Sequence, residues 1–379
     1  MNQTVINNAQ LVLKDEVIQG HLVLENGQIT DVGQGNSSLH QAMDMQGDYV
    51  IPGLVELHTD NMEKYFSPRP GVDWPGVAAA LAHDSQMSAA GITTVFDAVS
   101  VGYDFIGVRT DILPKIVESI TKAEQQGLHK AEHFIHLRCE VSSANTAEEF
   151  AEYFDNPLVK LASLMDHSPG QRQFADVDRY RQYYQGKYGF SDRKMDNFIK
   201  EHIDNSGLNS KRNRDAIAQN CHEYNIALAS HDDAKIEHVE ESIAYEVSIA
   251  EFPTTLAAAK KSHENQLQVL MGAPNIIRGQ SHSGNISASI LAEQGFLDII
   301  SSDYYPSSML HAAFKLAQID NGYDLADAIR CVSWNPASAV GLKDRGQIEV
   351  GKKADFLRVA MAEDLPILKQ VWKNGSRVN

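Results

Sequence analysis

The segment that decides the fold is VIPGLVELHTDNMEKYFSPRP, residues 50–70. It starts as the apolar run of a buried strand and then places His58 and Asp60 two residues apart. Side chains alternate faces along a strand, so this imidazole and this carboxylate share one face. Two cations, Lys64 and Arg69, follow shortly afterwards. The pattern indicates a buried strand that ends in an active-site loop.

Seven further apolar runs follow along the chain, and helix-compatible stretches separate most of them. They are ITTVFDAV, HFIHLRCEV, VKLASLMDH, NIALASHDD, SIAEFPT, QVLMGAP and DIISSDYY. Such alternation predicts parallel strands joined by crossover helices. Eight strand–helix units between residues 53 and 340 fit a (β/α)8 TIM-like barrel, whose usual length is about 250 residues.

The two ends of the chain have a different texture from the middle. Short apolar runs alternate there with turn formers, among them Asn26-Gly27 and Asn374-Gly375. We therefore expect residues 1–52 and 341–379 to build one small β domain of sandwich type. The segment of residues 171–215 is long and rich in aromatic and charged side chains. It predicts a helical excursion beyond a minimal barrel connection.

The composition excludes several classes of function. The formal net charge of −17 argues against binding to nucleic acid. No run of about 18 apolar residues is present, so we expect no membrane span. Three widely spaced cysteines suit reduced thiols, and hence a cytoplasmic protein, better than a disulfide framework.

Candidate metal ligands lie at the carboxyl ends of the predicted strands, where barrel enzymes carry their chemistry. They come from five strands: His58, Asp60, Glu140, His167, His231 and Asp303. His136 and Arg138 share a strand face with Glu140. Burying polar side chains at the ends of apolar runs costs free energy, so a functional reason for them is expected. Imidazole and carboxylate together are a ligand set for Zn²⁺ or a similar divalent ion.

Other catalytic motifs are absent from the sequence. It has no GxSxG elbow, no phosphate-binding GxxxxGK[ST] loop and no HExxH. Two further carboxylates, Asp232 and Asp233, follow His231 directly, and we interpret them as caps of the next helix.

The pattern as a whole resembles the amidohydrolase superfamily of metal-dependent hydrolases. The likeness rests on IPGLVELHTD, on the later strand-end histidines, on the last-strand aspartate and on GQIEVGKKADFLRV. Longer segments are similar to the branch that hydrolyses ribose 5-triphosphates in phosphonate catabolism. These segments are ELHTDNMEKYFSPRP, LMDHSPGQRQF, YYQGKY, ASHDDA, AEFPTT, MGAPNIIRGQSHSGN and SSDYYP.

The resemblance implies a role for each candidate ligand. His58 and Asp60 would hold one metal ion, His167 and His231 a second, and Glu140 would bridge them. Asp303 would bind the first ion and act as the general base. Two Zn²⁺ ions are expected, with Mn²⁺ or Fe²⁺ as alternatives because the set is rich in oxygen. The implied reaction is hydrolysis of a phosphoanhydride, in which water attacks the phosphorus next to the ribose and pyrophosphate leaves.

A triphosphate substrate carries about four negative charges and needs cations around it. The candidates are Arg138, Lys64, Arg69, Arg172, Lys187 and Arg278. His282 and Asn275 are candidates for contacts with sugar or phosphate. The helical excursion of residues 171–215 either closes over the triphosphate or forms the contact surface of a homo-oligomer.

Two other functions stay open at this point. One is a deaminase or cyclic-amide hydrolase on the same scaffold, although the cations after His58 favour an anionic small-molecule substrate. The other is a catalytically inactive barrel scaffold protein, against which the complete ligand set argues.

Overall fold

The computed structural model describes residues 3–69, 71–102, 112–281, 284–319 and 322–379. Contacts along the chain divide it into two compact units. The first consists of Met1–Asp97, Ile116–Phe134 and Met271–Asn379, and the second of Ala98–Lys115 and Ile135–Leu270. Within the described residues, no helix is both long enough and apolar enough to cross a membrane.

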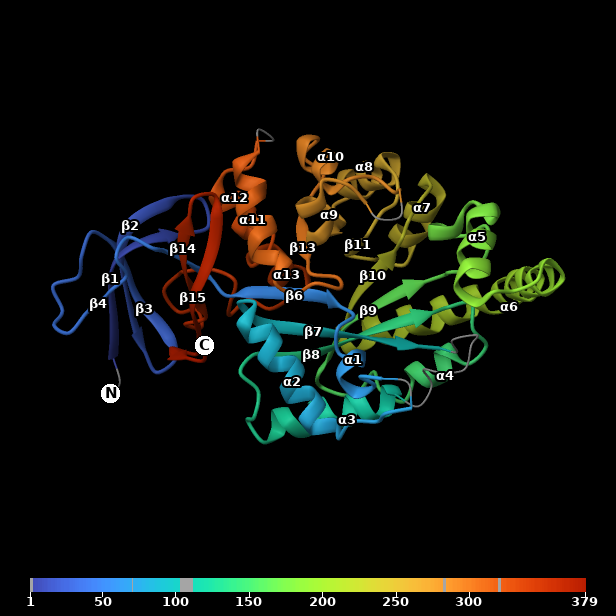
Figure 1. Cartoon of the computed structure of the whole chain (residues 1–379), viewed down its shortest axis with the longest axis horizontal. Helices are drawn as coiled ribbons and strands as arrows, with labels where there is room; N and C mark the ends of the chain where they lie inside the picture. Colours follow the sequence, from blue (N-terminus) through green and yellow to red (C-terminus); the bar gives the residue numbers. More distant parts are fainter. Residues whose placement is uncertain (1–2, 70, 103–111, 282–283, 320–321) are drawn as a thin grey trace. The chain divides into compact units, whose positions relative to one another are not determined.

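Eight strands form a nearly closed parallel barrel, which confirms the predicted fold class (Figure 1). In the sheet they follow the order β13-β12-β11-β10-β9-β8-β7-β6, so neighbours in sequence are neighbours in space. Each of the eight apolar runs became a strand. The strands are β6 (Leu54–Thr59), β7 (Ile92–Val101), β8 (Glu132–Glu140), β9 (Val159–Met165), β10 (Ala227–His231), β11 (Ile249–Glu251), β12 (Gln268–Gly272) and β13 (Ile299–Ser301).

Short helices follow most of the strands, and polar side chains fix where several of them begin. Thr255 and Ser287 accept hydrogen bonds from backbone N–H groups at the starts of α8 and α10, and Asp324 forms a capping box at α12. The helices are α1 (Glu63–Phe66), α2 (Gly76–Ala89), α3 (Ile112–Gln125), α4 (Thr146–Phe150), α7 (Ile236–Ala244), α8 (Leu256–Glu264), α9 (Ala273–Arg278), α10 (Ala288–Glu293), α11 (Ser308–Gln318), α12 (Leu325–Arg330) and α13 (Trp334–Ala339).

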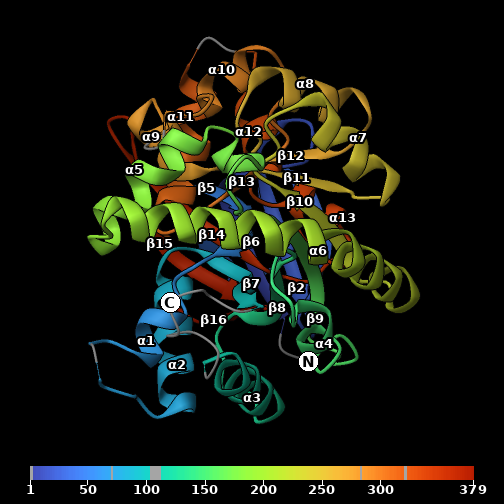
Figure 2. The same ribbon diagram turned by 90° about the vertical axis from the view of Figure 1, so that its right-hand side faces the viewer.

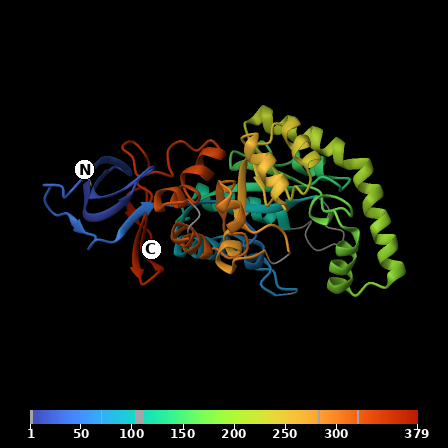
Figure 3. The same ribbon diagram turned by 90° about the horizontal axis from the view of Figure 1, so that it is seen from above.

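A separate, mostly antiparallel sheet contains strands from both ends of the chain, coloured blue and red in Figure 3. Two of its hairpins turn at Asn26-Gly27 and Asn374-Gly375, where all four residues have positive φ, as tight two-residue turns require. Phe356 and Trp372 stack in its core with ring centroids 5.3 Å apart. The strands are β1 (Gln3–Val12), β2 (Val17–Glu25), β3 (Gln28–Gln34), β4 (Met43–Asp44), β5 (Tyr49–Pro52), β14 (Phe356–Ala362), β15 (Leu365–Lys373) and β16 (Ser376–Arg377).

The aromatic, charged segment after β9 is helical. It forms η1 (Arg172–Phe174), α5 (Val177–Tyr188) and α6 (Asp192–Tyr224), and Figure 2 shows α6 as one unbroken helix. The α5–α6 turn buries an aromatic cluster that includes Phe174 and Tyr180. Asn209 and Asn213 of α6 donate hydrogen bonds to backbone carbonyls of residues 141–143. The helix is thereby fastened to the segment that follows β8.

Candidate metal centre

The first group of candidate ligands lies in the first unit, where β6 ends beside β13. His58 is buried, and its Nε2 lies 3.7 Å from Oδ1 of Asp60, whose side chain is 40% exposed. Asp303 follows β13 directly, and its N–H donates to the His58 carbonyl over 3.1 Å. The structure therefore brings together His58, Asp60 and Asp303, which follow the first and last strands.

Asp303 adopts a left-handed backbone conformation with φ of 57°. Aspartate and asparagine tolerate this region better than most residues with a side chain. A Cβ atom on Gly272, at the end of β12, would lie 3.4 Å from Oδ2 of Asp303. A side chain at Gly272 would thus begin in van der Waals contact with the Asp303 carboxylate.

Glu56 supports this group from inside the barrel, and the sequence reasoning missed it. Its carboxylate accepts hydrogen bonds from the Ser301 hydroxyl and from the backbone N–H groups of His58 and Ser302. Burial raises the pKa of Glu56 to about 7, although these hydrogen bonds lower it. Alternation along β6 puts Glu56 on the face of His58, and that was the available signal.

The second group lies in the second unit, where β8, β9 and β10 end. Oε2 of Glu140 is 2.7 Å from Nδ1 of His167, and Oε1 accepts a hydrogen bond from the His167 backbone N–H over 3.2 Å. The rings of His167 and His231 meet edge to face with centroids 5.7 Å apart. The structure therefore brings together Glu140, His167 and His231.

Two further carboxylates join the second group. Asp232 lies 3.8 Å from Nε2 of His167 and 3.5 Å from Nε2 of His231. Glu251, the last residue of β11, lies 3.1 Å from Nδ1 of His231 and is fully buried. Glu251 was not among the predicted ligands, because it lies inside the run SIAEFPT, and only the structure shows that the strand ends at this residue.

The expectation that Asp232 and Asp233 cap a helix is wrong. Helix α7 starts at Ile236 with Lys235 at its N-cap, and no side chain caps it. Asp232 has φ of 57°, so the chain turns sharply after His231 and directs this carboxylate at the two imidazoles. Asp233 instead pairs with the guanidinium of Arg172.

A model of the amidohydrolase family matches residues 49–378. The chain belongs to this family. It is 48% identical over 376 residues to the alpha-D-ribose 1-methylphosphonate 5-triphosphate diphosphatase of Escherichia coli (strain K12), covering 99% of this chain and 100% of that relative. It is 24% identical to the imidazolonepropionase of Thermoplasma volcanium, over 96% of this chain and 91% of the relative.

Solved structures of other amidohydrolases share the fold. The N-isopropylammelide isopropylaminohydrolase of Burkholderia multivorans superposes with a TM-score of 0.66 at 16% identity, covering 100% of this chain and 98% of that one. At this identity the likeness concerns the fold alone. It agrees with the barrel and the separate sheet described above.

The donor set of this amidohydrolase fits a divalent ion. His167, His231 and Asp232 each offer one ligand atom, and these atoms lie within 4.8 Å of one another. Burial lowers the pKa of His167, but the Glu140 and Asp232 carboxylates outweigh it and raise this pKa to about 10. The carboxylates thus demand a positive charge here, which a proton or a bound metal ion can supply.

The candidate phosphate-binding cations lie in different surroundings. Arg138 on β8 is half-buried. Burial raises the pKa of Asp232, but the positive charges of His231, His167 and Arg138 outweigh burial and lower this pKa. Lys64 is exposed and donates to Oδ1 of Asn61. Arg69 and Arg278 are exposed too, on the loop after α1 and at the end of α9.

The remaining candidates are held by other contacts or lie outside the description. Arg172 is only 3% exposed and pairs with Asp233 and Glu241. Lys187 is exposed on α5 and lies over the rings of Tyr183 and Tyr188. Asn275 connects α9 to the backbone of Ile286 and Ala288. His282 lies outside the described residues.

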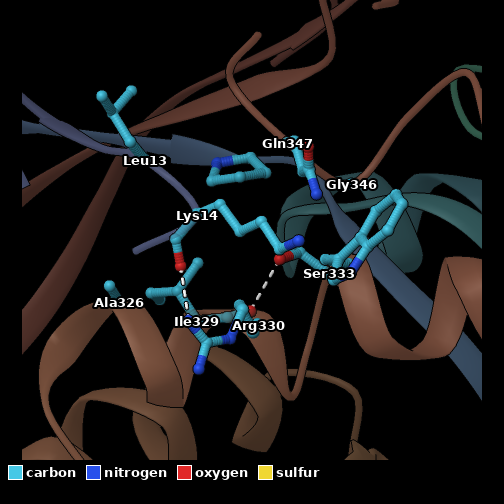
Figure 4. A pocket seen from close by; sticks show the side chains of 10 residues that line it. Leu13, Lys14, Ala326, Ile329, Arg330, Ser333, Gly346 and Gln347 are labelled. Atoms are coloured by element: carbon cyan, nitrogen blue, oxygen red, sulfur yellow. Dashed lines mark hydrogen bonds between the residues drawn. The ribbon is translucent and has the colours of Figure 1, made fainter. Parts of the chain in front are cut away.

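A small pocket of the first unit is lined by none of these candidates. Arg330 donates to the Lys14 carbonyl there, and Ser333 to that of Ile329 (Figure 4). Lys14 Nζ lies 5.3 Å from the centre of the Trp334 ring, so its charge is engaged with the wall of the pocket.

Proposed function

We propose that this chain hydrolyses alpha-D-ribose 1-methylphosphonate 5-triphosphate to the 5-phosphate and pyrophosphate, as a step of phosphonate catabolism. The observation that carries the proposal is the 48% identity to the Escherichia coli diphosphatase across practically the full length of both chains. The imidazolonepropionase is more distant, at 24% identity, and an adenine deaminase matches over only 22% of this chain.

Two divalent ions, zinc by preference and manganese or iron otherwise, complete the proposed centre. His58, Asp60 and Asp303 would hold one ion, and His167, His231 and Glu140 would hold the other. When bound, such ions lower the pKa of water towards neutrality and offset the charge of phosphate oxygens. Glu251 orients His231, because its carboxylate lies 3.1 Å from Nδ1 of that ring, and Asp232 offers a further ligand oxygen beside His167 and His231.

Asp303 takes the proton of the attacking water. The water oxygen forms a bond to the phosphorus next to the ribose, the bond from that phosphorus to the bridging oxygen breaks, and pyrophosphate leaves with this oxygen. Asp303 suits the role because its backbone is fixed from both sides: its N–H donates to His58 and its carbonyl accepts from Asp60. A general base must be positioned before its pKa matters.

Lys64 is held near the same loop by a relay through one amide side chain. Its ammonium donates to Oδ1 of Asn61, and Nδ2 of Asn61 donates to the Asp303 carbonyl over 3.3 Å. A positive charge is thus tethered beside the proposed base. This charge would offset part of the negative charge of a triphosphate.

The proposal is tested by a substrate panel. Purified protein is stripped with a chelator, reloaded with Zn²⁺, Mn²⁺ or Fe²⁺, and incubated with ribose 5-triphosphates, nucleoside triphosphates and cyclic amides. We expect metal-dependent release of pyrophosphate, fastest with the methylphosphonate-bearing ribose triphosphate. Release of ammonia from an amide or amine substrate, without pyrophosphate from any triphosphate, would replace the proposal by the deaminase alternative. Inactivity on the whole panel with every metal would favour the scaffold alternative.

A further inference from the structure

A second cluster of imidazoles and carboxylates lies inside the first unit, apart from the residues of the proposed centre. His83 comes from α2, Asp97 from β7 and His133 from the start of β8. Nε2 of His83 is 2.7 Å from Oδ1 of Asp97, and Nδ1 of His133 is 2.7 Å from Oδ2. All three residues are 0% exposed. We call these three residues the His83 cluster.

Other polar groups surround the cluster. Oδ1 of Asp84 lies 3.3 Å from Nε2 of His133, on the side of the ring that faces away from Asp97. Backbone N–H groups of Lys130 and Ala131 fix the Asp84 carboxylate. The ring of His129 lies with its centroid 4.1 Å from that of His133.

Two buried ring nitrogens near the cluster lack a hydrogen-bond partner in the part of the chain that is described. They are Nδ1 of His83 and Nε2 of His129. Buried polar atoms are seldom left unpaired in a folded protein, but neither of these two atoms faces Asp97, because His83 contacts Asp97 through Nε2. Within the described ranges, Asp84 and Asp97 also form no ion pair with lysine or arginine, and their ion-pair partners are histidines.

Two buried carboxylates without lysine or arginine need positive charge from another source. Either the histidines are protonated or a cation lies among them. The ligand atoms of His83, Asp97 and His133 lie within 4.8 Å of one another, which is close enough to share one ion. Tetrahedral zinc with bonds of about 2.1 Å separates its nitrogen and oxygen ligands by about 3.4 Å. Small ring rotations at His83 and His133 would open the 2.7 Å contacts to this value.

We propose that the His83 cluster is a structural divalent-metal site that takes zinc, with His83, Asp97 and His133 as ligands. Asp84 has the role of the carboxylate that commonly fixes the outer nitrogen of a metal-binding histidine. Complete burial leaves no path for a substrate, so the ion serves structure and not catalysis. It fastens α2 to the strands β7 and β8. The proposal does not depend on the proposed hydrolysis.

Metal analysis tests the site in the purified full-length protein. Wild type and the variants His83→Asn and His133→Asn are grown with zinc, dialysed against a weak chelator and measured by mass spectrometry for metal per chain. We expect each variant to lose one equivalent of zinc relative to wild type. His129→Asn is the matched control, because it removes a buried imidazole of the same region that is not a ligand, and it should retain the equivalent.

The double variant His167→Asn/His231→Asn separates this site from the proposed catalytic centre. It should still bind one zinc ion through the His83 cluster, and a chelator should still lower its melting temperature, whether or not wild type hydrolyses any triphosphate. Equal zinc in wild type, His83→Asn and His133→Asn would overturn the proposal and leave the cluster as a proton-bearing hydrogen-bond network.

Crystals of wild type decide the matter if the cluster variants fail to fold. Anomalous scattering at the zinc edge should show a peak between Nε2 of His83 and Nδ1 of His133. A map from zinc-grown protein with no peak there, and with the two contacts still short enough for hydrogen bonds, would overturn the proposal equally.

Discussion

The backbone N–H of Asp303 donates to the carbonyl of His58 over 3.1 Å, so the end of the last barrel strand is joined to the end of the first. The Asp303 carbonyl accepts a second hydrogen bond from the N–H of Asp60 over 3.2 Å. The backbone of Asp303 thus positions the other two candidate ligands of the first unit, His58 and Asp60. Substitution of the Asp303 carboxylate should therefore test chemistry without disturbing this join.

Asp303→Asn should lower kcat by about 10³-fold, within the range that general acid–base groups contribute. The fold should persist, because asparagine also accepts the left-handed conformation at φ of 57°. Pyrophosphate release measures the activity, and circular dichroism with thermal unfolding monitors the fold. Asp364→Asn, at an exposed position, is the control and should have no effect. Activity close to wild type in Asp303→Asn would remove Asp303 from the role of base.

Arg138→Ala should lower kcat/KM for a triphosphate by about 10- to 100-fold, since a hydrogen bond between charged groups contributes about 1.5–3 kcal/mol. A small neutral ester, if turned over at all, should lose little. Steady-state kinetics on both substrates give the comparison. Arg212→Ala, at a side chain that is 53% exposed, serves as the control. Equal losses on both substrates would show that Arg138 does not contact phosphate.

The sequence revealed the barrel because its strands are buried on both faces. Such strands appear as apolar runs, and all eight runs became strands. The ends of those runs predicted His58, Glu140 and His231 as candidate ligands, because parallel strands present their carboxyl ends at one edge of a barrel. Both Asn-Gly pairs became hairpin turns, because asparagine and glycine accept the positive φ that such turns require.

The features that could not be predicted from the sequence depend on contacts between residues far apart in the chain or on local backbone turns. Arg172 has the appearance of a surface cation, and only the structure shows that Asp233, 61 residues away, takes up its charge. Asp232 resembles a helix cap until its left-handed φ directs it at His167 and His231. Glu56 shares a strand face with His58, but only the structure shows its hydrogen bond with Ser301, which is 245 residues distant.

Arg172→Ala should destabilise the protein by about 3–5 kcal/mol, the usual cost when one partner of a buried ion pair is removed. The guanidinium is 3% exposed, and its loss leaves Asp233 buried without this counter-charge. Urea unfolding followed by circular dichroism measures the change. Arg179→Ala on α5, where the side chain is 64% exposed, should change stability by less than about 1 kcal/mol. Wild-type stability in Arg172→Ala would show that Arg172 is a free cation available to substrate.

His202 of α6 should make stability fall as the solution is acidified. It is 2% exposed, and its Nδ1 shares a hydrogen bond of 2.5 Å with the Tyr180 hydroxyl. Burial lowers the pKa of His202 to about 4 from its ordinary value of 6.5. At pH values between about 4 and 6.5, His202 binds a proton in the unfolded chain but not in the folded protein. Stability is therefore lost as pH falls from 6.5 towards 4, by up to about 3 kcal/mol.

His202→Asn isolates this effect from the carboxylates that titrate in the same range. The asparagine oxygen can accept the Tyr180 hydrogen bond in place of Nδ1 but does not titrate. Urea unfolding at pH 7, 6, 5 and 4 should show wild type losing more stability on acidification than His202→Asn. His222→Asn, on the same helix with a side chain that is 43% exposed, should follow wild type. Parallel curves for wild type and His202→Asn would mean that His202 is protonated in the folded protein as readily as in the unfolded chain.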